Sequence, residues 1–271
     1  MQTPLDFYFG VFASFSGVLN MYKKNIPKDQ LIMGLHAVKE VLTHAPHRLL
    51  HVFLEPQEKG RKSDIQELCT FQKIPMTFTS FRQLTDMVES ESHQSVVAHV
   101  KGRNFVDLKN FFREIEGKER SFVLMLDQIF DPQNLGALLR SSECFGVDAV
   151  VFSKNRGSDI TPVATKSSCG ASELIPLIRV SNLAEAVSQF QEEGFDAVTT
   201  LLNPSSESLF DFTFSDKTLL IMGSEGEGIQ PLICKRANRS IYIPMQGHIE
   251  SLNVAQACAV LLSAAARQRN P

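Results

Sequence analysis

Apolar residues recur along the chain with the periods of helices and of strands, in two regions. A charged stretch near residues 101–120 separates these regions. In the first region, residues 33–42 and 61–72 have the spacing of amphipathic helices. Short apolar runs over residues 51–55 and 95–100 predict strands. The pattern therefore predicts a small α/β module of about 80 residues.

The second region alternates strands and helices more regularly. Continuous runs rich in Val, Ile and Leu predict strands over residues 122–127, 148–152, 173–180, 196–202, 218–223 and 240–244. Helical patterns cover residues 135–145, 182–194, 232–237 and 253–269. Such alternation is typical of a parallel sheet covered on both faces, whose ligands bind beyond the carboxyl ends of the strands. Asp127, Gly223 and Pro244 stand at those positions.

These patterns divide the chain into four parts. We expect a leader over residues 1–30, either disordered or an over-extended start, a first domain over 31–102, a linker over 103–120 and a second domain over 121–271. The first 20 residues are rich in aromatic side chains and lack the basic region that a secretory signal requires.

The composition is that of an ordinary globular protein, with 43% hydrophobic and 21% charged residues among 271. No run reaches the ~18 apolar residues that cross a bilayer, so we expect no membrane partner. Five scattered cysteines without a C-x-x-C pair indicate a reducing compartment, and we expect a cytoplasmic protein. The net charge of −3 does not by itself favour nucleic acid.

A glycine-rich turn with two carboxylates follows the strand predicted over residues 218–223. Its glycines lack the G-x-G-x-x-G spacing, and no G-K-S/T follows. Glu225 and Glu227 would each repel a phosphate by roughly 4 kcal/mol at ~4 Å in an effective dielectric of ~20. The turn therefore suits a neutral or cationic ligand, or a carboxylate that holds a polar partner. A tight turn with solvated glutamates fits the residues equally well.

Two further segments place polar residues at helix starts. Asn134 begins a helix that carries Arg140, and Ser251 is a natural N-cap with Asn253 in the first turn that follows. Each residue alone also fits a purely structural role, since the amide and hydroxyl groups can cap helices and Arg140 can pair with Glu143.

Three motifs in order carry a resemblance: N-L-G-x-x-x-R at 134–140, G-x-E-G-x-G at 223–228 and I-P-M-x-G-x-x-x-S-L-N-V at 243–254. Together they closely resemble the motifs of the SPOUT-class RNA 2′-O-ribose methyltransferases, the SpoU or TrmH group. G-L-H-A-V at 34–38 and H-Q-S-V-V-A at 93–98 are similar to the RNA-binding domain of the branch that methylates a guanosine of bacterial 23S rRNA.

The resemblance implies an α/β fold in which a small L30e-like N-terminal domain precedes a SPOUT domain with a parallel sheet and a C-terminal trefoil knot. It implies S-adenosylmethionine as cofactor, with S-adenosylhomocysteine as product. Carried over by motif, the cofactor contacts fall on Gly223, Ile243 and Leu252, and less firmly on Leu201 and Met245. It also implies a homodimer in which each site is completed near the partner subunit, and RNA, expected to be 23S rRNA, as partner rather than DNA.

The same resemblance implies a set of catalytic residues and no metal: Asn134, Arg140, Glu225, Ser251 and Asn253. Arg140 stays protonated in proteins, so we expect a fixed positive charge that stabilises a developing alkoxide and grips the adjacent phosphate. The seven histidines show no metal-ligand spacing.

Two departures from the family pattern affect the expected RNA entrance. Ala255 replaces a frequent serine, and Glu250 replaces a small polar residue. We expect RNA contacts from basic residues in three clusters: Lys59, Arg61 and Lys62; Lys101 and Arg103; Lys154 and Arg156.

Several alternatives remain open. A tRNA 2′-O-methyltransferase of the same class and a non-catalytic RNA-binding relative fit the same motifs. A Rossmann-type nucleotide oxidoreductase fits the predicted sheet but lacks the glycine fingerprint.

Overall fold

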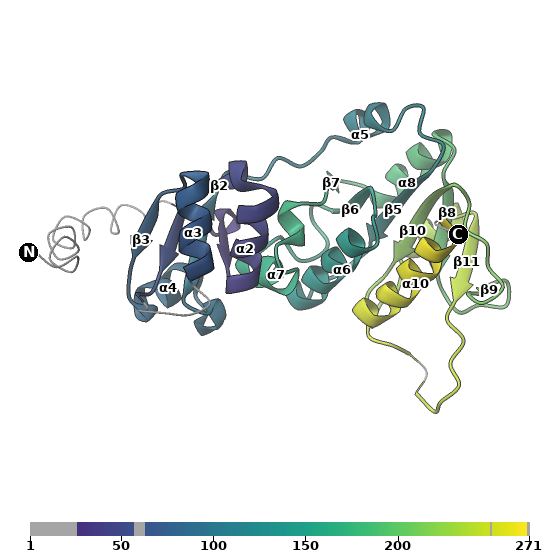
Figure 1. Cartoon of the computed structure of the whole chain (residues 1–271). Coiled ribbons are helices and arrows are strands. Elements are labelled where there is room, and N and C mark those ends of the chain that lie inside the picture. Colours follow the sequence, from purple (N-terminus) through teal and green to yellow (C-terminus); the bar gives the residue numbers. More distant parts are fainter. Residues whose placement is uncertain (1–25, 57–62, 250, 270–271) are drawn as a thin grey trace, which may run out of the picture.

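The computed structural model describes residues 26–56, 63–249 and 251–269, and the chain forms two α/β units with a sheet each (Figure 1). Most of the predicted leader and Glu250 lie outside the described residues. Within the described part of the predicted leader, the short 3₁₀ helix η1 (Lys28–Gln30) leads into the first strand.

The first unit is a four-stranded mixed sheet with strand order β1-β4-β2-β3. Strands β1 and β2 both run antiparallel to β4, whereas β3 runs parallel to β2. The strands are β1 (Leu31–Met33), β2 (Leu49–Leu54), β3 (Met76–Phe78) and β4 (Val96–Val100). The helices are α2 (Leu35–His44), α3 (Ser63–Gln72) and α4 (Phe81–Val88).

The four elements that the sequence predicts in this unit are present, while three short ones were missed. Strands β1 and β3 have three residues each, too few for an alternation to be recognised. Helix α4 was also missed, although Ser80 and Gln83 form a capping box at its start. The predicted first helix begins two residues too early, because Met33 belongs to β1 and Gly34, at φ 100°, turns the chain into α2.

The second unit contains a seven-stranded sheet in which every strand pairing is parallel, which confirms the predicted parallel sheet. Its strand order is β7-β6-β5-β10-β8-β11-β9. The strands are β5 (Ser121–Leu126), β6 (Ala149–Ser153), β7 (Leu177–Val180), β8 (Asp196–Thr200), β9 (Glu207–Ser208), β10 (Lys217–Met222) and β11 (Arg239–Tyr242). The helices are α5 (Leu108–Glu114), α6 (Pro132–Cys144), α7 (Pro162–Ser167), α8 (Leu183–Glu192), α9 (Pro231–Arg236) and α10 (Val254–Arg269).

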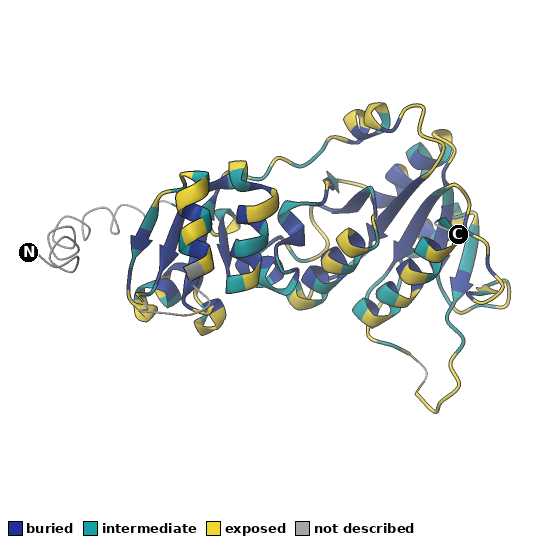
Figure 2. Cartoon of the chain, viewed as in Figure 1, coloured by how far each residue is buried: buried dark blue, intermediate teal, exposed yellow. Residues whose placement is uncertain are grey.

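Helices cover this sheet on both faces, and the alternation of side chains along β5 shows why its strands are apolar throughout. Phe122 and Leu124 point into the core beneath α6 and α10, whereas Val123 and Met125 point into the core beneath α5, α8 and α9. Figure 2 shows the buried strands between helices whose outer faces are exposed. Binding groups can therefore gather only at the edges of the sheet.

Three segments differ from the sequence prediction. The strand predicted over 173–180 is confined to β7, because Pro176 has no N–H for the ladder and Ala171–Glu173 forms the 3₁₀ helix η4 instead. The charged stretch over 103–120 contains α5, which Asp107 caps and which buries Phe111. Helix α7 was missed, because its six residues, PVATKS, include few large apolar side chains that could show a helical period.

Two histidines stand opposite each other in the first sheet, since His51 of β2 is in register with His99 of β4. The ring of His51 bonds the hydroxyl of Thr77 at 2.8 Å. Burial, and then the neighbouring His99, lower the pKa of His51 below 6.5, and burial also lowers the pKa of His99. Both rings thus bind a proton less readily in the folded chain than in the unfolded one.

We predict that the chain loses stability as the pH falls below 6.5, the pKa of an unperturbed histidine. Above that pH both rings are neutral in both states, and below it protonation favours the unfolded state until the folded pKa is passed. Thermal unfolding followed from about pH 8 to about pH 5 measures the effect. His99→Leu should flatten this profile, while replacement of the exposed His47 by Gln should not.

Candidate active site

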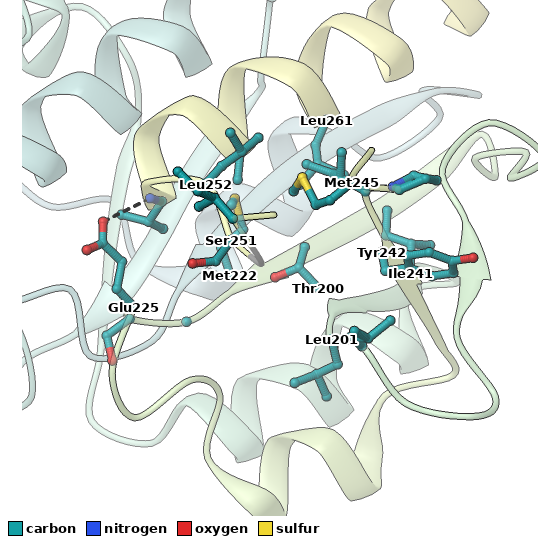
Figure 3. Close-up of a pocket in the computed structure, with 18 of the residues that line it drawn as sticks. Thr200, Leu201, Met222, Glu225, Ile241, Tyr242, Met245, Ser251, Leu252 and Leu261 are labelled. Atoms are coloured by element: carbon teal, nitrogen blue, oxygen red, sulfur yellow. Dashed lines mark hydrogen bonds between the residues drawn. The ribbon is translucent and has the colours of Figure 1, made fainter. Parts of the chain in front are cut away.

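A cavity of about 800 Å³ opens at the carboxyl edge of the parallel sheet, where strands β8, β10 and β11 end. All five sequence-predicted cofactor positions line it, the two weaker ones included: Leu201, Gly223, Ile243, Met245 and Leu252. Figure 3 shows Leu252 and Met245 above the cavity, Leu201 below it and Glu225 at the left. The segments after three neighbouring strands thus form one largely apolar cavity with a carboxylate at its border.

The turn after β10 is compact because its glycines allow a close backbone approach. A Cβ on Gly223 would lie 2.2 Å from the carbonyl oxygen of Gly228, which no real side chain can do. Gly228 has φ 68° and its N–H donates to the Ser224 carbonyl at 3.1 Å. The turn folds back on itself and holds Glu225 out toward the C-terminal helix.

The carboxylate of Glu225 joins this turn to the start of α10. Its Oε1 accepts hydrogen bonds from Asn253 Nδ2 at 2.6 Å and from the backbone N–H of Val254, the first residue of α10, at 3.1 Å. The dashed line in Figure 3 marks a hydrogen bond of this carboxylate. A negative charge at a helix N-terminus is favourable, since it satisfies a free N–H and complements the helix dipole. The glycine turn is therefore held against the start of α10 by Glu225.

Asn253 extends the network to the start of α6, because its Nδ2 also donates to Asn134 Oδ1 at 3.1 Å. Its Oδ1 accepts from the N–H of Ala255 at 2.9 Å, so Asn253 rather than Ser251 is the residue whose side chain caps α10. The prediction of Ser251 as N-cap is thus wrong. Ser251 instead lines the cavity three residues before the helix begins.

Arg140 lies apart from the other predicted catalytic residues. It is an exposed residue of α6, and it lines a second cavity, of about 770 Å³, between α6 and helix α2 of the first unit. Arg140 comes six residues after Asn134, an offset that carries it away from the site along the helix and around its axis. Within one chain the structure therefore brings together Asn134, Glu225 and Asn253, but not Arg140.

The sequence placed Asp127 at the edge of the sheet, but its role as a buried support beneath the site was not predicted. Asp127, fully buried at the end of β5, accepts hydrogen bonds from the backbone N–H of Gln230 at 2.8 Å and from its side-chain amide at 2.7 Å. These bonds anchor the chain that leaves the glycine turn. A carboxylate at the end of an otherwise apolar strand was the available signal.

The three clusters of basic residues predicted to contact RNA differ in their surroundings. The side chain of Arg103 is 10% exposed and paired with Glu173, so its charge is engaged within the protein. Lys101 of the same cluster is exposed, and an RNA contact there stays a prediction. Arg156 donates to Gln230 Oε1 at 2.6 Å from an exposed position. Lys59, Arg61 and Lys62 lie outside the described residues.

Among the described residues, no set of three or more His, Cys, Asp or Glu side chains is arranged to hold a metal ion. In that same part of the chain, no helix combines the length and the apolar character needed to cross a membrane.

The fold and the cavity define a class: a two-unit α/β protein whose parallel sheet carries a ligand cavity beyond its strand ends. Residues 121–263, more than half of the chain, match the SpoU rRNA Methylase family, and residues 31–106 match the RNA 2′-O ribose methyltransferase substrate binding family. The chain belongs to the SpoU rRNA methylase family.

Two relatives agree with this membership, and a solved structure shares the fold. The chain is 36% identical to the 23S rRNA (guanosine-2′-O-)-methyltransferase RlmB of Escherichia coli K12, over 89% of this chain and 100% of that one. It is 34% identical to RlmB of Haemophilus influenzae, over 89% and 98%. The crystal structure of the SpoU methyltransferase AviRb from Streptomyces viridochromogenes in complex with AdoMet superposes with a TM-score of 0.72 at 24% identity, covering 88% of this chain and 89% of that one.

We predict that Gly223→Ala lowers the free energy of unfolding by about 1–3 kcal/mol, because the new methyl group forces the turn apart. Urea unfolding measures the loss. Gly226→Ala in the same turn is the matched control, since a Cβ there meets nothing within 4 Å and should leave stability almost unchanged. Equal stability of the two variants would contradict the tight approach.

Proposed function

We propose that the chain methylates the 2′-hydroxyl of a ribose in RNA with S-adenosylmethionine as donor, and that the target is a guanosine of 23S rRNA. The observation that carries the proposal is the 36% identity to a 23S rRNA guanosine-2′-O-methyltransferase along that protein's whole length. The match of residues 31–106 to a substrate-binding family adds that both units of such an enzyme are represented.

The cavity at the sheet edge suits this donor. Its volume of about 800 Å³ is ample for a nucleoside-sized ligand, and Leu201, Ile243 and Leu252 offer apolar surface to an adenine. Gly223 has no side chain between the backbone and the ligand. The carboxylate of Glu225 at the border favours a cation over a phosphate. S-adenosylmethionine supplies a methyl group on a positively charged sulfur.

The chain's own residues would bind and orient the reacting groups. Asn253 and Glu225, hydrogen-bonded to each other, fix the cavity wall, and Asn134 presents its amide at the same place. Arg140 would lie against the ribose and its phosphate, where its fixed charge stabilises the oxygen that loses a proton. The guanidinium cannot itself accept that proton, because it is protonated throughout the physiological range.

A homodimer would supply the missing arginine, and its support is the separation of Arg140 from the cofactor cavity within one chain. Large apolar side chains that line that cavity are also exposed, as expected of a surface that a second copy covers: Leu202 is 80% exposed, Ile249 77% and Met245 38%. In the dimer each cavity would be completed by Arg140 of the partner subunit.

The finer fold assignments belong to the same proposal. The segment after β11 returns beside the glycine turn, where the N–H of Val254 bonds Glu225, and α10 then packs against α6. This arrangement supports the C-terminal trefoil knot. The compact sheet over residues 31–100 supports an L30e-like domain. The proposed domain boundaries are 31–102 and 121–271, with a linker between them whose helix α5 packs against the second unit, and the proposed location is cytoplasmic.

A tRNA is the second candidate substrate, because the A. aeolicus TrmH/SpoU tRNA modifying enzyme is similar in structure, with a TM-score of 0.51 at 27% identity over 60% of this chain and 82% of that one. Mapping ribose methylation in total RNA from cells with and without the gene separates the candidates. Loss of one mark in 23S rRNA supports the proposal, whereas loss of a tRNA mark overturns the substrate assignment. Intact marks in both RNAs would favour a non-catalytic relative.

We predict that Arg140→Lys lowers the rate of methyl transfer about 100-fold, because a point charge cannot reproduce the planar fork of hydrogen bonds. The affinity for S-adenosylmethionine, measured by calorimetry, should stay within about twofold of the parent. Arg113→Lys on α5, exposed and remote from both cavities, is the control. Near-normal turnover of the Arg140 variant would count against the assigned role.

We predict that two inactive variants restore activity when mixed. Chains with Arg140→Ala keep an intact cavity, and chains with Glu225→Ala keep the arginine, so each heterodimer has one complete site. Random exchange should therefore recover roughly a quarter of the parent activity. The measurement is methyl transfer to RNA after the chains have exchanged, and a mixture no more active than its components would show that each site is complete within one chain.

A further inference from the structure

A carboxylate that the function does not use is buried between the two units. Glu173 ends the 3₁₀ helix η4 of the second unit, and its side chain is 0% exposed. It comes directly before Leu174, which packs against the core of the first unit. A charged group in such a place is costly unless its oxygens are fully paired.

Two arginines from different parts of the chain satisfy it. Arg48, in the first unit, donates to Glu173 Oε2 from Nη2 at 2.8 Å and from Nε at 3.2 Å. Arg103, which follows the first sheet, donates to Oε1 of the same carboxylate and also to the carbonyl of Ser172. Arg48 further donates to the carbonyl of Gly102 at 3.1 Å, so the three segments form one closed network.

The rest of the contact between the units is largely close packing. Helix α7 lies against β1, and Val163 packs against the core of the first unit that contains Leu31 and Met33. A Cβ on Gly170 would come within 2.9 Å of the carbonyl oxygen of Ala37. Figure 1 shows α7 and α2 side by side at this boundary. Apolar burial is non-directional, whereas a guanidinium fork on a carboxylate fixes an orientation.

We propose that Glu173 is a positioning residue, which with Arg48 and Arg103 sets the orientation of the substrate-binding unit toward Arg140. The cavity of about 770 Å³ that contains Arg140 has one wall from α2, with His36 and His44, and one wall from α6. Its width therefore depends on how the first unit is held. The inference rests on the proposed function, because the geometry matters to catalysis only if RNA spans both units.

The test is the kinetics of Arg48→Gln, which removes one fork and leaves Arg103 to neutralise the carboxylate. The substrate is 23S rRNA from cells that lack the gene, with radiolabelled S-adenosylmethionine. We expect KM for RNA to rise about tenfold, with kcat within about threefold and cofactor affinity within about twofold of the parent. Arg48→Lys keeps the charge without the fork and should recover part of the loss. Asp216→Asn, which removes the exposed ion pair with Arg120, is the matched control and should change none of these values.

A direct readout separates this inference from the proposed function. Spin labels on exposed positions of the two units, at Glu67→Cys and Glu192→Cys with the accessible native cysteines replaced by serine, report the distance between α3 and α8. We expect a broader distance distribution with Arg48→Gln than without it, whether or not any RNA is methylated. An unchanged distribution together with an unchanged KM for RNA overturns the proposal.

A second variant covers the case in which Arg48→Gln does not fold. Methionine at all three positions, Arg48→Met, Arg103→Met and Glu173→Met combined, removes the buried charges and keeps apolar volume, a replacement that proteins often tolerate. The proposal expects this variant to fold with the raised KM and the broadened distances. Parent-like values of both would overturn it, because packing alone would then hold the units in place.

Discussion

The candidate site depends on the hydrogen bonds that the Glu225 carboxylate accepts at the start of α10. One carboxylate oxygen satisfies the first N–H of a 16-residue helix and also holds Asn253, which reaches Asn134 at the start of α6. Three segments far apart in the chain meet at this oxygen. Without it, an N–H at the helix end loses its partner and the wall between the glycine turn and the C-terminal segment loses its fixed position.

The same charge separates two binding tasks. A cavity bordered by Glu225 disfavours phosphate and favours a positively charged methyl donor, so the RNA backbone must be held by another part of the protein. Arg140, exposed in the cleft between the units, has the opposite preference. Placing the acid and the arginine in different cavities prevents them from neutralising each other in a single chain, and it makes the proposed site depend on how units and copies are arranged.

Much of the fold could be predicted from the sequence, because long apolar runs are buried on both faces. The strands around Val123, Val150 and Leu220 and the helices α6, α8 and α10 were found in this way. Four short elements, β1, β3, α4 and α7, were missed, since their identity is decided by the surfaces they pack on and not by a repeating pattern. Pro176 shortened a strand for a local reason that the sequence did display.

For the site, the sequence by itself determined the chemistry of each position: a turn that requires glycine at 223, a carboxylate at 225, amides at 134 and 253, and a permanent cation at 140. Only the tertiary structure decided which of these meet. Gly223 and Glu225 line the cavity at one strand edge, and Asn253 and Asn134 join Glu225 through hydrogen bonds. Arg140 lines another cavity, because a helix turns its residues around an axis that the pattern cannot orient. The burial of Glu173 between two arginines was likewise invisible, since charged residues far apart in sequence carry no signal of mutual contact.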